Sequence, residues 1–317
     1  MSHYLKNILL VGTGPMAVEY VKVLRDLDVS PHVVGRSQQA CAAFEEKTGI
    51  KAVSGGLENQ VLGLYDGAIV CTGVEQLANC TLYCLHAGIK NILVEKPAGL
   101  YQSDIQAIAD LAEAQQANVL VAYNRRFYAS VLAALEGIEA DGGVSSFHFE
   151  FTEWSHTIEP LQKAAGVKER WLVANSSHVI DLAFLMGGEP QIMHSMADGN
   201  LSWHAKSSFV GMGKSDKGAL FSYQANWNAP GRWSVEILTQ KNKYIFRPLE
   251  QLQLQAKGSV QVVAQVIDDS LDKKYKAGLF LQTKYWLLQE NKLAFLTIHQ
   301  QLARFKIYDE ILNGNQE

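Results

Sequence analysis

The stretch ILLVGTGPMAVEY at residues 8–20 decides the expected fold of the first part of this chain. Its four apolar residues, Ile8–Val11, are typical of a buried strand, and Pro15–Leu27 is typical of a helix. The turn between them, GTGPMA, is a G-x-G-x-x-A motif, in which glycines let backbone N–H groups approach a pyrophosphate at a helix N-terminus. In this setting the motif predicts a dinucleotide-binding turn rather than a tight turn without a ligand. The predicted contact residues are Gly12, Thr13, Gly14, Pro15 and Met16.

Short apolar runs alternate with helical stretches as far as residue 123. The predicted buried strands are Ile8–Val11, His32–Val34, Ala68–Cys71, Ile92–Val94 and Val119–Ala122. The predicted helices between them are Pro15–Leu27, Ser37–Thr48, Glu75–Ala87 and Ser103–Gln115. This alternation predicts a Rossmann domain at residues 1–123, with a doubly wound parallel sheet.

The pattern changes after about residue 143, where β-type segments follow one another with turn residues between them. These segments are Val144–Trp154, Ile192–Asn200, Ser208–Met212, Ala219–Trp227, Trp233–Thr239 and Lys243–Phe246. Helices are expected at Arg125–Leu135, Ala174–Met186, Lys276–Glu290 and Leu296–Leu312. Residues 124–317 are therefore predicted to form an α+β domain with an open, mainly antiparallel sheet. In an alternative division, the last helices of the chain pack back on the first domain.

Charge and composition exclude several classes of protein. The chain of 317 residues has 28 Lys and Arg against 32 Asp and Glu, and no basic run, which argues against a nucleic-acid partner. No apolar run reaches the roughly 18 residues of a membrane span, and the N-terminus lacks the layout of a signal peptide. Four cysteines do not form a disulfide framework, so we expect reduced thiols in a cytoplasmic protein, with Cys80 and Cys84 in the core.

The end of the second predicted strand bears on the choice between NADP and NAD. A site for NAD usually has Asp or Glu at this point, where the chain instead has Gly35-Arg36-Ser37. Arg36 and Ser37 are suited to hold a ribose 2′-phosphate, so we predict NADP as the preferred cofactor and NAD as the alternative. The competing interpretation of Arg36 is an exposed cation near a helix start.

The predicted strand Ile92–Val94 leads into the sequence Val94-Glu95-Lys96-Pro97, at the carboxyl edge where sheets of this kind bind ligands. A lysine beside a cationic nicotinamide would have a lowered pKa, which suits it to accept a proton or to bind an alcohol. Pro97 is a residue that can fix the turn with a cis bond.

Five motifs in order resemble the glucose-fructose oxidoreductase, inositol dehydrogenase and MocA family (Gfo/Idh/MocA). They are GTGPMA at 12–17, CTG-x-x-x-x-A at 71–78, VEKPAGL at 94–100, AYNRRF at 122–127 and NSSHVIDL at 175–182. The resemblance implies an NAD(P)-dependent dehydrogenase or reductase that transfers a hydride between nicotinamide and a carbinol carbon of a sugar, cyclitol or nucleotide-sugar. It also implies a homodimer or homotetramer formed through the sheet of the second domain, which binds the substrate.

The same resemblance assigns roles to individual residues. It implies that Lys96 contacts the reacting hydroxyl and that His178 accepts or donates the proton. Further cofactor contacts would be Cys71, Thr72, Glu95, Lys96 and Asn124. The substrate-contact candidates are Lys96, Asn124, Arg125, Trp171, Asn175 and His178. From the residues themselves, Arg125-Arg126 is a candidate to contact a phosphate or carboxylate, with a solvated helix start as the alternative, and Trp171 is a candidate to pack on a sugar ring, with core or interface packing as the alternative.

Departures from the family pattern keep a second function open. The family often has Asp where this chain has Ala174, and commonly a His where it has Leu77. The alternative is therefore a cofactor-binding regulator or a partner subunit without catalysis. His178 and Asp181 stand three residues apart on one predicted helix, but no third ligand is evident, so we expect no metal site.

Overall fold

The computed structural model describes residues 4–60, 63, 65–291 and 294–314. The chain forms two compact units. Unit 1 contains Met1–Asn124 and Leu271–Phe305, and unit 2 contains Arg125–Ser270 and Lys306–Glu317. The late segment that begins at Leu271 thus belongs to the same unit as the first part of the chain.

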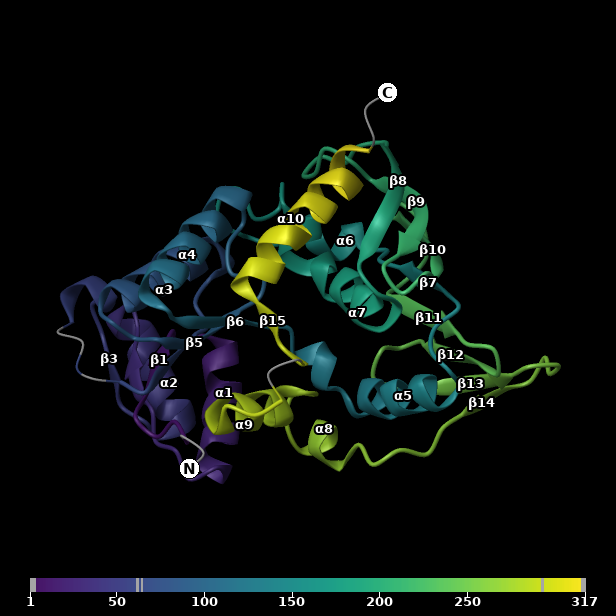
Figure 1. Ribbon diagram of the computed structural model, residues 1–317. Helices are drawn as coiled ribbons and strands as arrows, with labels where there is room; N and C mark the ends of the chain where they lie inside the picture. Colours follow the sequence, from purple (N-terminus) through teal and green to yellow (C-terminus); the bar gives the residue numbers. More distant parts are fainter. Residues whose placement is uncertain (1–3, 61–62, 64, 292–293, 315–317) are drawn as a thin grey trace. The chain divides into compact units, whose positions relative to one another are not determined.

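Unit 1 is built on a seven-stranded sheet with the order β15-β6-β5-β4-β1-β2-β3 (Figure 1). The strands are β1 (Ile8–Val11), β2 (His32–Val34), β3 (Ala52–Val53), β4 (Gly67–Val70), β5 (Asn91–Glu95), β6 (Asn118–Ala122) and β15 (Leu296–Thr297). Pairing among β1–β6 is parallel, and β15 adds antiparallel to β6 with Leu296 opposite Val121. The predicted doubly wound parallel sheet is confirmed.

Helices of unit 1 follow the predicted strand–helix alternation. They are α1 (Pro15–Asp26), α2 (Gln38–Thr48), α3 (Leu77–His86), α4 (Gln102–Gln115) and α9 (Leu279–Leu288), with short turns η1 (Leu57–Asn59) and η2 (Val74–Gln76) and the short helix α8 (Ser270–Lys274). α1 buries Ala17, Tyr20, Val21 and Leu24, and α9 packs against it (Figure 1). This contact, together with β15, ties the late segment to the Rossmann sheet.

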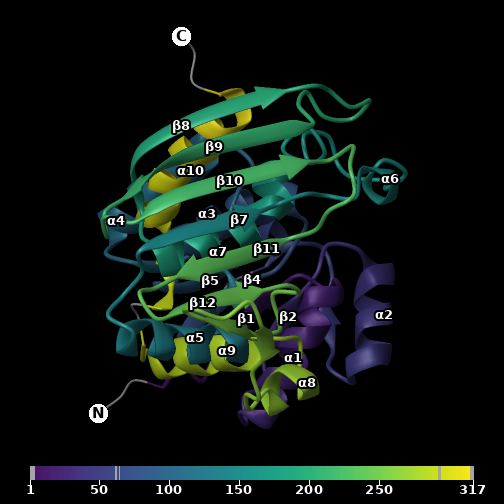
Figure 2. The same cartoon turned by 90° about the vertical axis from the view of Figure 1, so that its right-hand side faces the viewer.

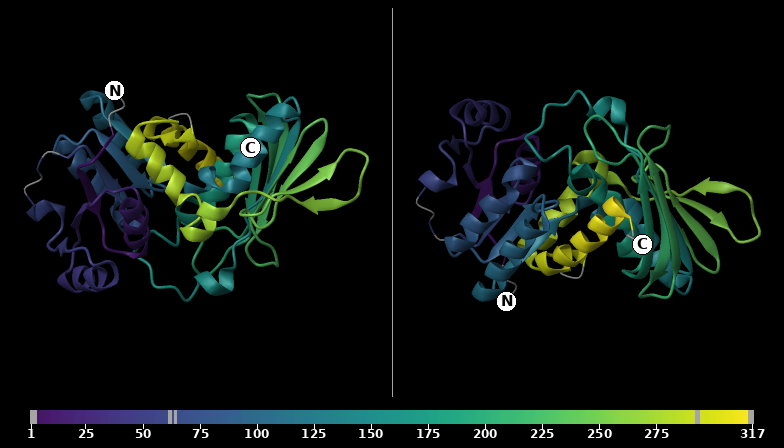
Figure 3. Two further views of the ribbon diagram at one scale, coloured as in Figure 1. Left: turned by 90° about the horizontal axis from the view of Figure 1, so that it is seen from below. Right: turned by 90° about the horizontal axis from the view of Figure 1, so that it is seen from above.

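Unit 2 contains an eight-stranded sheet with the order β14-β13-β12-β11-β7-β10-β9-β8 (Figure 2). The strands are β7 (Ser146–Glu150), β8 (Pro190–Asp198), β9 (Ser208–Ser215), β10 (Leu220–Asn226), β11 (Ser234–Leu238), β12 (Asn242–Phe246), β13 (Gln253–Ala256) and β14 (Val262–Ala264). All neighbouring pairs are antiparallel except β7 and β10, which confirms an open, mainly antiparallel sheet. Strands β13 and β14 form a hairpin at one end of it (Figure 3).

One face of the unit 2 sheet packs on helix α7 (Ser177–Gly187) through aromatic side chains. Phe184 of this helix meets Phe147 and Phe149 edge-on, with ring centroids 6.0 and 5.5 Å apart. Burial of large aromatic surfaces in such arrangements stabilises the layer beyond the area that it removes from water. This aromatic packing therefore holds α7 against the sheet.

The predicted helix starts of unit 2 need correction. Arg125 lies in a 3-10 turn, η3 (Asn124–Phe127), and the helix α5 begins only at Ala129 and ends at Ala140. The segment before α7 is a π-helix over Leu172–Ser176. The remaining helices are α6 (Ser155–Ile158) and α10 (Ile298–Asn313), whose residues divide between the two units.

Candidate functional site

The glycine turn after β1 is shaped by close approach of the backbone. Gly12 has φ of +121°, and a Cβ atom added to it would lie 2.6 Å from the carbonyl oxygen of Cys71 at the end of β4. A side chain therefore cannot be placed there without moving the strand. Gly14 caps α1, and a Cβ atom added to it would meet nothing within 4 Å, while Pro15 occupies the first turn of the helix. The helix N-terminus thus opens onto free space, as a pyrophosphate site requires.

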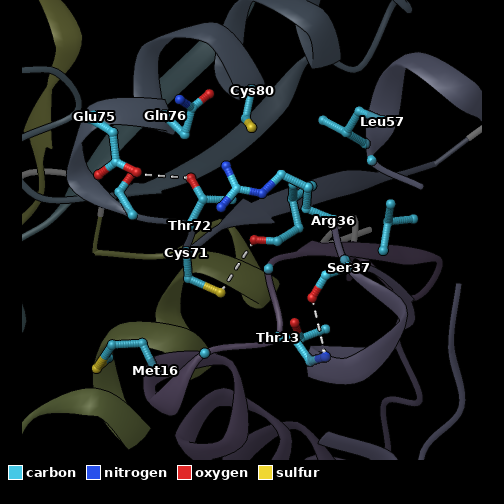
Figure 4. A pocket seen from close by; sticks show the side chains of 18 of the residues that line it. Thr13, Met16, Arg36, Ser37, Leu57, Cys71, Thr72, Glu75, Gln76 and Cys80 are labelled. Atoms are coloured by element: carbon cyan, nitrogen blue, oxygen red, sulfur yellow. Dashed lines mark hydrogen bonds between the residues drawn. The ribbon is translucent and has the colours of Figure 1, made fainter. Parts of the chain in front are cut away.

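A cavity of about 510 Å³ lies at the carboxyl ends of β1, β2 and β4 (Figure 4). It brings together the predicted cofactor residues Gly12, Thr13, Gly14, Pro15, Met16, Arg36, Ser37, Cys71 and Thr72. Helix N-termini and glycine turns at the carboxyl edge of a parallel sheet are where dinucleotides bind in this fold. The residues at this cavity therefore fit a dinucleotide.

Several cavity residues were not among the predicted contacts. They include Gly56, Leu57, Glu58, Glu75, Gln76 and Cys80. Gly55 and Gly56 donate their backbone N–H groups to the carbonyls of Arg36 and Gly35, at 3.1 and 3.0 Å, which holds that turn against the end of β2. A Gly-Gly pair was the signal for this turn in the sequence. Cys80 is half-buried and lines the cavity, so its expected place in the core is wrong, whereas Cys84 is buried.

Packing at Gly35 explains the missing acid after β2. An added Cβ atom would lie 2.6 Å from Cys41 Sγ and 2.7 Å from Thr13 Cγ2, so any side chain at this position requires these two neighbours to move. Arg36 is exposed and extends into the cavity (Figure 4). The Ser37 hydroxyl caps α2 by accepting from the N–H of Ala40 at 3.2 Å. A cation and a helix N-terminus therefore stand together at the end of β2.

The turn Glu95-Lys96-Pro97 lies at the end of β5. These three residues are not among those that line the cavity. The Lys96–Pro97 bond is cis, and the Gln301 side chain donates to the carbonyl of Pro97 at 2.9 Å. Burial raises the pKa of the Glu95 carboxyl, and the Tyr20 hydroxyl, which donates to it at 2.8 Å, opposes this shift. Lys96 itself is half-buried.

Asn124 also lies outside the cavity lining within the described residues. Its side-chain amide donates to the carbonyl of Ala277 at 2.9 Å, so the segment that returns to unit 1 holds it in place. The structure does not bring Glu95, Lys96 and Asn124 together with the glycine turn in one cavity.

Of the unit 2 candidates, His178 lies at the start of α7, and Asn175 lies in the π-helix just before it. His178 is buried, with 7% of its surface exposed, and its ring centroid is 6.1 Å from that of Trp233. The π-helix over Leu172–Ser176 directly precedes it, and such turns are frequent at functional sites. Ala174 belongs to this π-helix, so its spacing from His178 is not that of a regular α-helical turn.

A buried carboxylate does stand near this helix start, but it comes from Glu153. Its Oε1 atom accepts from the Asn175 amide at 2.9 Å and from the Ser176 hydroxyl at 2.7 Å. Glu153 is 2% exposed, and Arg232 Nη1 lies 3.4 Å from its other oxygen. Sequence reasoning missed Glu153 because it follows β7, far along the chain from the helix that it contacts.

Arg125, His178, Arg232 and Trp233 form a group that we call the Trp233 cluster. The guanidinium carbons of Arg125 and Arg232 lie 4.9 and 4.8 Å from the indole centroid. Arg125 is half-buried, and burial lowers the pKa of its guanidinium. The Arg125 side chain is therefore partly withdrawn from water. Arg232 and Trp233 were not predicted, since the sequence showed there only a turn and a strand.

Arg126 and Asp181 form a buried ion pair with two parallel contacts. Arg126 Nε lies 2.7 Å from Asp181 Oδ2, and Nη2 lies 2.6 Å from Oδ1. The side chains are 5% and 1% exposed. This pair ties α7 to the η3 turn, and it gives Asp181 a structural partner.

Trp171 packs among other tryptophans. It meets Trp203 edge-on at 6.2 Å, and Trp203 stacks on Trp227 at 5.7 Å. Trp171 is 8% exposed. Trp171 thus lies in an aromatic cluster, the kind of environment that the alternative of core packing expects.

The comparisons with known proteins agree with this architecture. Residues 6–123 match the model of the Gfo/Idh/MocA family, described as an oxidoreductase family with an NAD-binding Rossmann fold. No curated protein sequence matches the chain significantly. No helix in the described part of the chain is long and apolar enough to cross a membrane.

Solved structures of similar fold cover nearly the whole chain. Levoglucosan dehydrogenase in complex with NADH and L-sorbose has a TM-score of 0.78 and 17% identity, covering 96% of this chain and 95% of that one. UDP-N-acetylglucosamine 3-dehydrogenase GnnA from Acidithiobacillus ferrooxidans has a TM-score of 0.73 and 13% identity, covering 96% of each. An oxidoreductase from Agrobacterium radiobacter in complex with NAD⁺, L-tartaric acid and magnesium has a TM-score of 0.74 and 13% identity, covering 96% and 94%.

The parallel sheet and the glycine-lined cavity are those of an NAD-binding Rossmann domain, and the matching family is one of oxidoreductases. Over residues 6–123 the chain matches the Gfo/Idh/MocA family, in agreement with the family that the motifs predict.

Proposed function

We propose that this protein is an NADP-preferring oxidoreductase that transfers a hydride between nicotinamide and a carbinol carbon of a sugar, cyclitol or nucleotide-sugar. The observation that carries the proposal is the glycine-lined cavity at the carboxyl edge of the Rossmann sheet, in a domain that matches an NAD-binding family. Support for the substrate class comes from levoglucosan dehydrogenase and UDP-N-acetylglucosamine 3-dehydrogenase, which share the fold.

Two residues of this chain carry the proposed chemistry. Lys96 contacts the reacting oxygen and polarises it, and His178 accepts or donates the hydroxyl proton. When bound, the cofactor supplies or accepts the hydride. Glu95 and Asn124 are proposed to contact the nicotinamide end. Glu153 and Asn175, joined at 2.9 Å, hold the start of the helix that carries His178. Turnover with a panel of sugars, followed by nicotinamide absorbance, tests the reaction class.

Arg36 is the residue that we expect to set the preference for NADP. Arg36→Ala should weaken NADPH binding by about 1.5–3 kcal/mol, the scale of a hydrogen bond to a charged group, and leave NADH binding nearly unchanged. Titration calorimetry with both cofactors measures the two effects. Lys47→Ala, which removes an exposed cation from the last turn of the same helix α2, is the matched control. Equal losses for the two cofactors would refute the assignment to NADP.

We further propose that the protein is a homodimer or homotetramer through the outer face of the unit 2 sheet. This face, opposite α7, exposes large apolar side chains on three neighbouring strands: Ile192, Met196, Val210, Met212 and Leu220. Contiguous exposed apolar surface of this kind marks an interaction site. Figure 2 shows β8, β9 and β10 side by side.

Charges on this face should separate the subunits. We expect the double variant Met212→Lys and Leu220→Lys to shift the protein to a monomer, because lysine cannot be buried against a second apolar face without cost. Light scattering after size-exclusion chromatography measures the mass. Val260→Lys, at a residue that is 95% exposed between β13 and β14, is the control and should leave the mass unchanged. A parent that is itself monomeric would refute this part of the proposal.

A further inference from the structure

The guanidinium of Arg125 is a cation that the described residues leave without a hydrogen bond or an ion pair. Its Nε atom is buried and has no partner. Its ring contacts are Trp233 at 4.9 Å and Tyr128 at 5.9 Å from the guanidinium carbon. Arginine keeps its charge at every accessible pH, and the two Nη atoms of Arg125 are not among the buried unpartnered atoms, so they are open to hydrogen bonds from a ligand or from water.

The neighbouring arginines differ from Arg125 in this respect. Arg126 is paired with Asp181 through two contacts. Arg232 faces Glu153 at 3.4 Å, and its guanidinium carbon lies 4.6 Å from the Trp154 ring and 4.8 Å from the Trp233 ring. Among the described residues, carboxylates therefore pair with two of the three cations, and none lies within pairing distance of Arg125.

Acidic groups near Arg125 do not change this balance. Glu153 is engaged by Asn175, Ser176 and Arg232, and the exposed Glu250 accepts from the Tyr128 hydroxyl at 3.4 Å. Both carboxylates act on Arg125 only through longer-range attraction. The Trp233 cluster with Glu153 thus has two positive charges and one negative charge when His178 is neutral.

The cluster also places this unmatched cation beside the proposed proton-transfer residue. Trp233 lies beside both residues. Its ring centroid is 4.9 Å from the guanidinium carbon of Arg125 and 6.1 Å from the imidazole centroid of His178. A ligand whose reacting hydroxyl meets His178 therefore has a guanidinium within reach of another substituent. Planar guanidinium groups bind carboxylates and phosphates through two parallel hydrogen bonds.

We propose that the substrate carries an anionic group, a carboxylate or a phosphate, and that Arg125 binds it through two hydrogen bonds beside Trp233. This inference rests on the proposed function and narrows its substrate class from sugars, cyclitols and nucleotide-sugars to those members that carry a carboxylate or a phosphate. Arg232, fixed between two indoles and Glu153, adds positive potential at the same place.

Ligand binding tests this inference independently of turnover. Glucose, mannose and galactose are each compared as the neutral sugar, the uronate and the 6-phosphate, with NADPH present, by calorimetry and by tryptophan fluorescence. We expect at least one uronate or phosphate to bind at least about tenfold more tightly than its neutral parent. The two anionic series distinguish a carboxylate from a phosphate.

Variants connect the effect to Arg125. Arg125→Gln should weaken binding of the preferred anion by about 10- to 100-fold and leave the neutral sugar and NADPH unchanged, while Arg125→Lys should recover part of the loss. Lys241→Gln removes a positive charge from the same unit outside the cluster and should have no effect.

Three results would overturn the inference. They are equal binding of anionic and neutral sugars, an Arg125→Gln variant that binds the anion normally, and a variant that loses NADPH binding instead, which would assign Arg125 to the cofactor. The proposed function fails by a different result, namely anion binding that depends on Arg125 without any change in nicotinamide absorbance.

Discussion

Replacement of Lys96 by Met should lower turnover by at least about 100-fold, the scale of an acid–base group, and keep NADPH binding within about tenfold of the parent. Lys96 directly follows β5, at the carboxyl edge where sheets of this kind bind their ligands. Methionine retains the apolar stem of the lysine but removes the charge and the hydrogen-bond donors. The loss should therefore appear in kcat and not in folding or cofactor affinity.

The measurement is steady-state turnover together with calorimetry for NADPH. Lys90→Met is the matched control, because Lys90 is exposed and immediately precedes the same strand at its other end. If Lys96→Met turns over at the rate of the parent, Lys96 is structural and the proposed chemistry is wrong.

Loss of Asp181 should be the most destabilising single change that we predict. Asp181→Ala should lower the free energy of unfolding by about 3–5 kcal/mol, because it leaves the buried guanidinium of Arg126 without its carboxylate. Both side chains are almost fully buried, so water cannot replace the lost partner. Urea denaturation measures the change. An unchanged slope of the free energy of unfolding against urea concentration indicates that the folded state is otherwise intact.

A double variant separates the pair from its surroundings. Arg126→Met combined with Asp181→Leu removes both charges and should recover most of the stability that Asp181→Ala loses, since apolar replacements of buried pairs are often neutral. Additive losses in the double variant would show that the ion pair is not the source of the effect.

Unit 1 was largely predictable because its strands are short apolar runs between turn signals. The predicted Ile8–Val11 and His32–Val34 are identical to β1 and β2. The two-residue strands β3 and β15 were missed, since so few residues show no periodicity. The sequence left two alternatives for the last helices, because their place in this unit depends on contacts such as that of α9 with α1 and not on the local pattern of residues.

Strand order in unit 2 is likewise a property of distant contacts. β7 pairs parallel with β10 and antiparallel with β11, although some 70 to 90 residues separate it from them along the chain. Alternating residues predict that a segment is a strand, but they do not specify its neighbours. The class of sheet was therefore predictable and its topology was not.

The candidate site divides in the same way. Contacts of the glycine turn are adjacent in the sequence, so a motif predicts them together. Glu153, Arg232 and Trp233 come from separate segments and gain significance only through their contacts with Asn175, Arg125 and His178. Conversely, His178 and Arg125 were predicted from motifs, but their shared contact with Trp233 was not.

The rate of change of nicotinamide absorbance tests the central claim most directly. Purified protein is mixed with NADPH, NADP⁺, NADH or NAD⁺ and the panel of neutral and acidic sugars, with Lys96→Met and His178→Ala measured alongside. The account predicts turnover of at least one compound by the parent, faster with the phosphorylated cofactor, and a loss of at least about 100-fold in Lys96→Met. Tight NADPH binding without turnover of any compound would contradict the account and favour a cofactor-binding regulator.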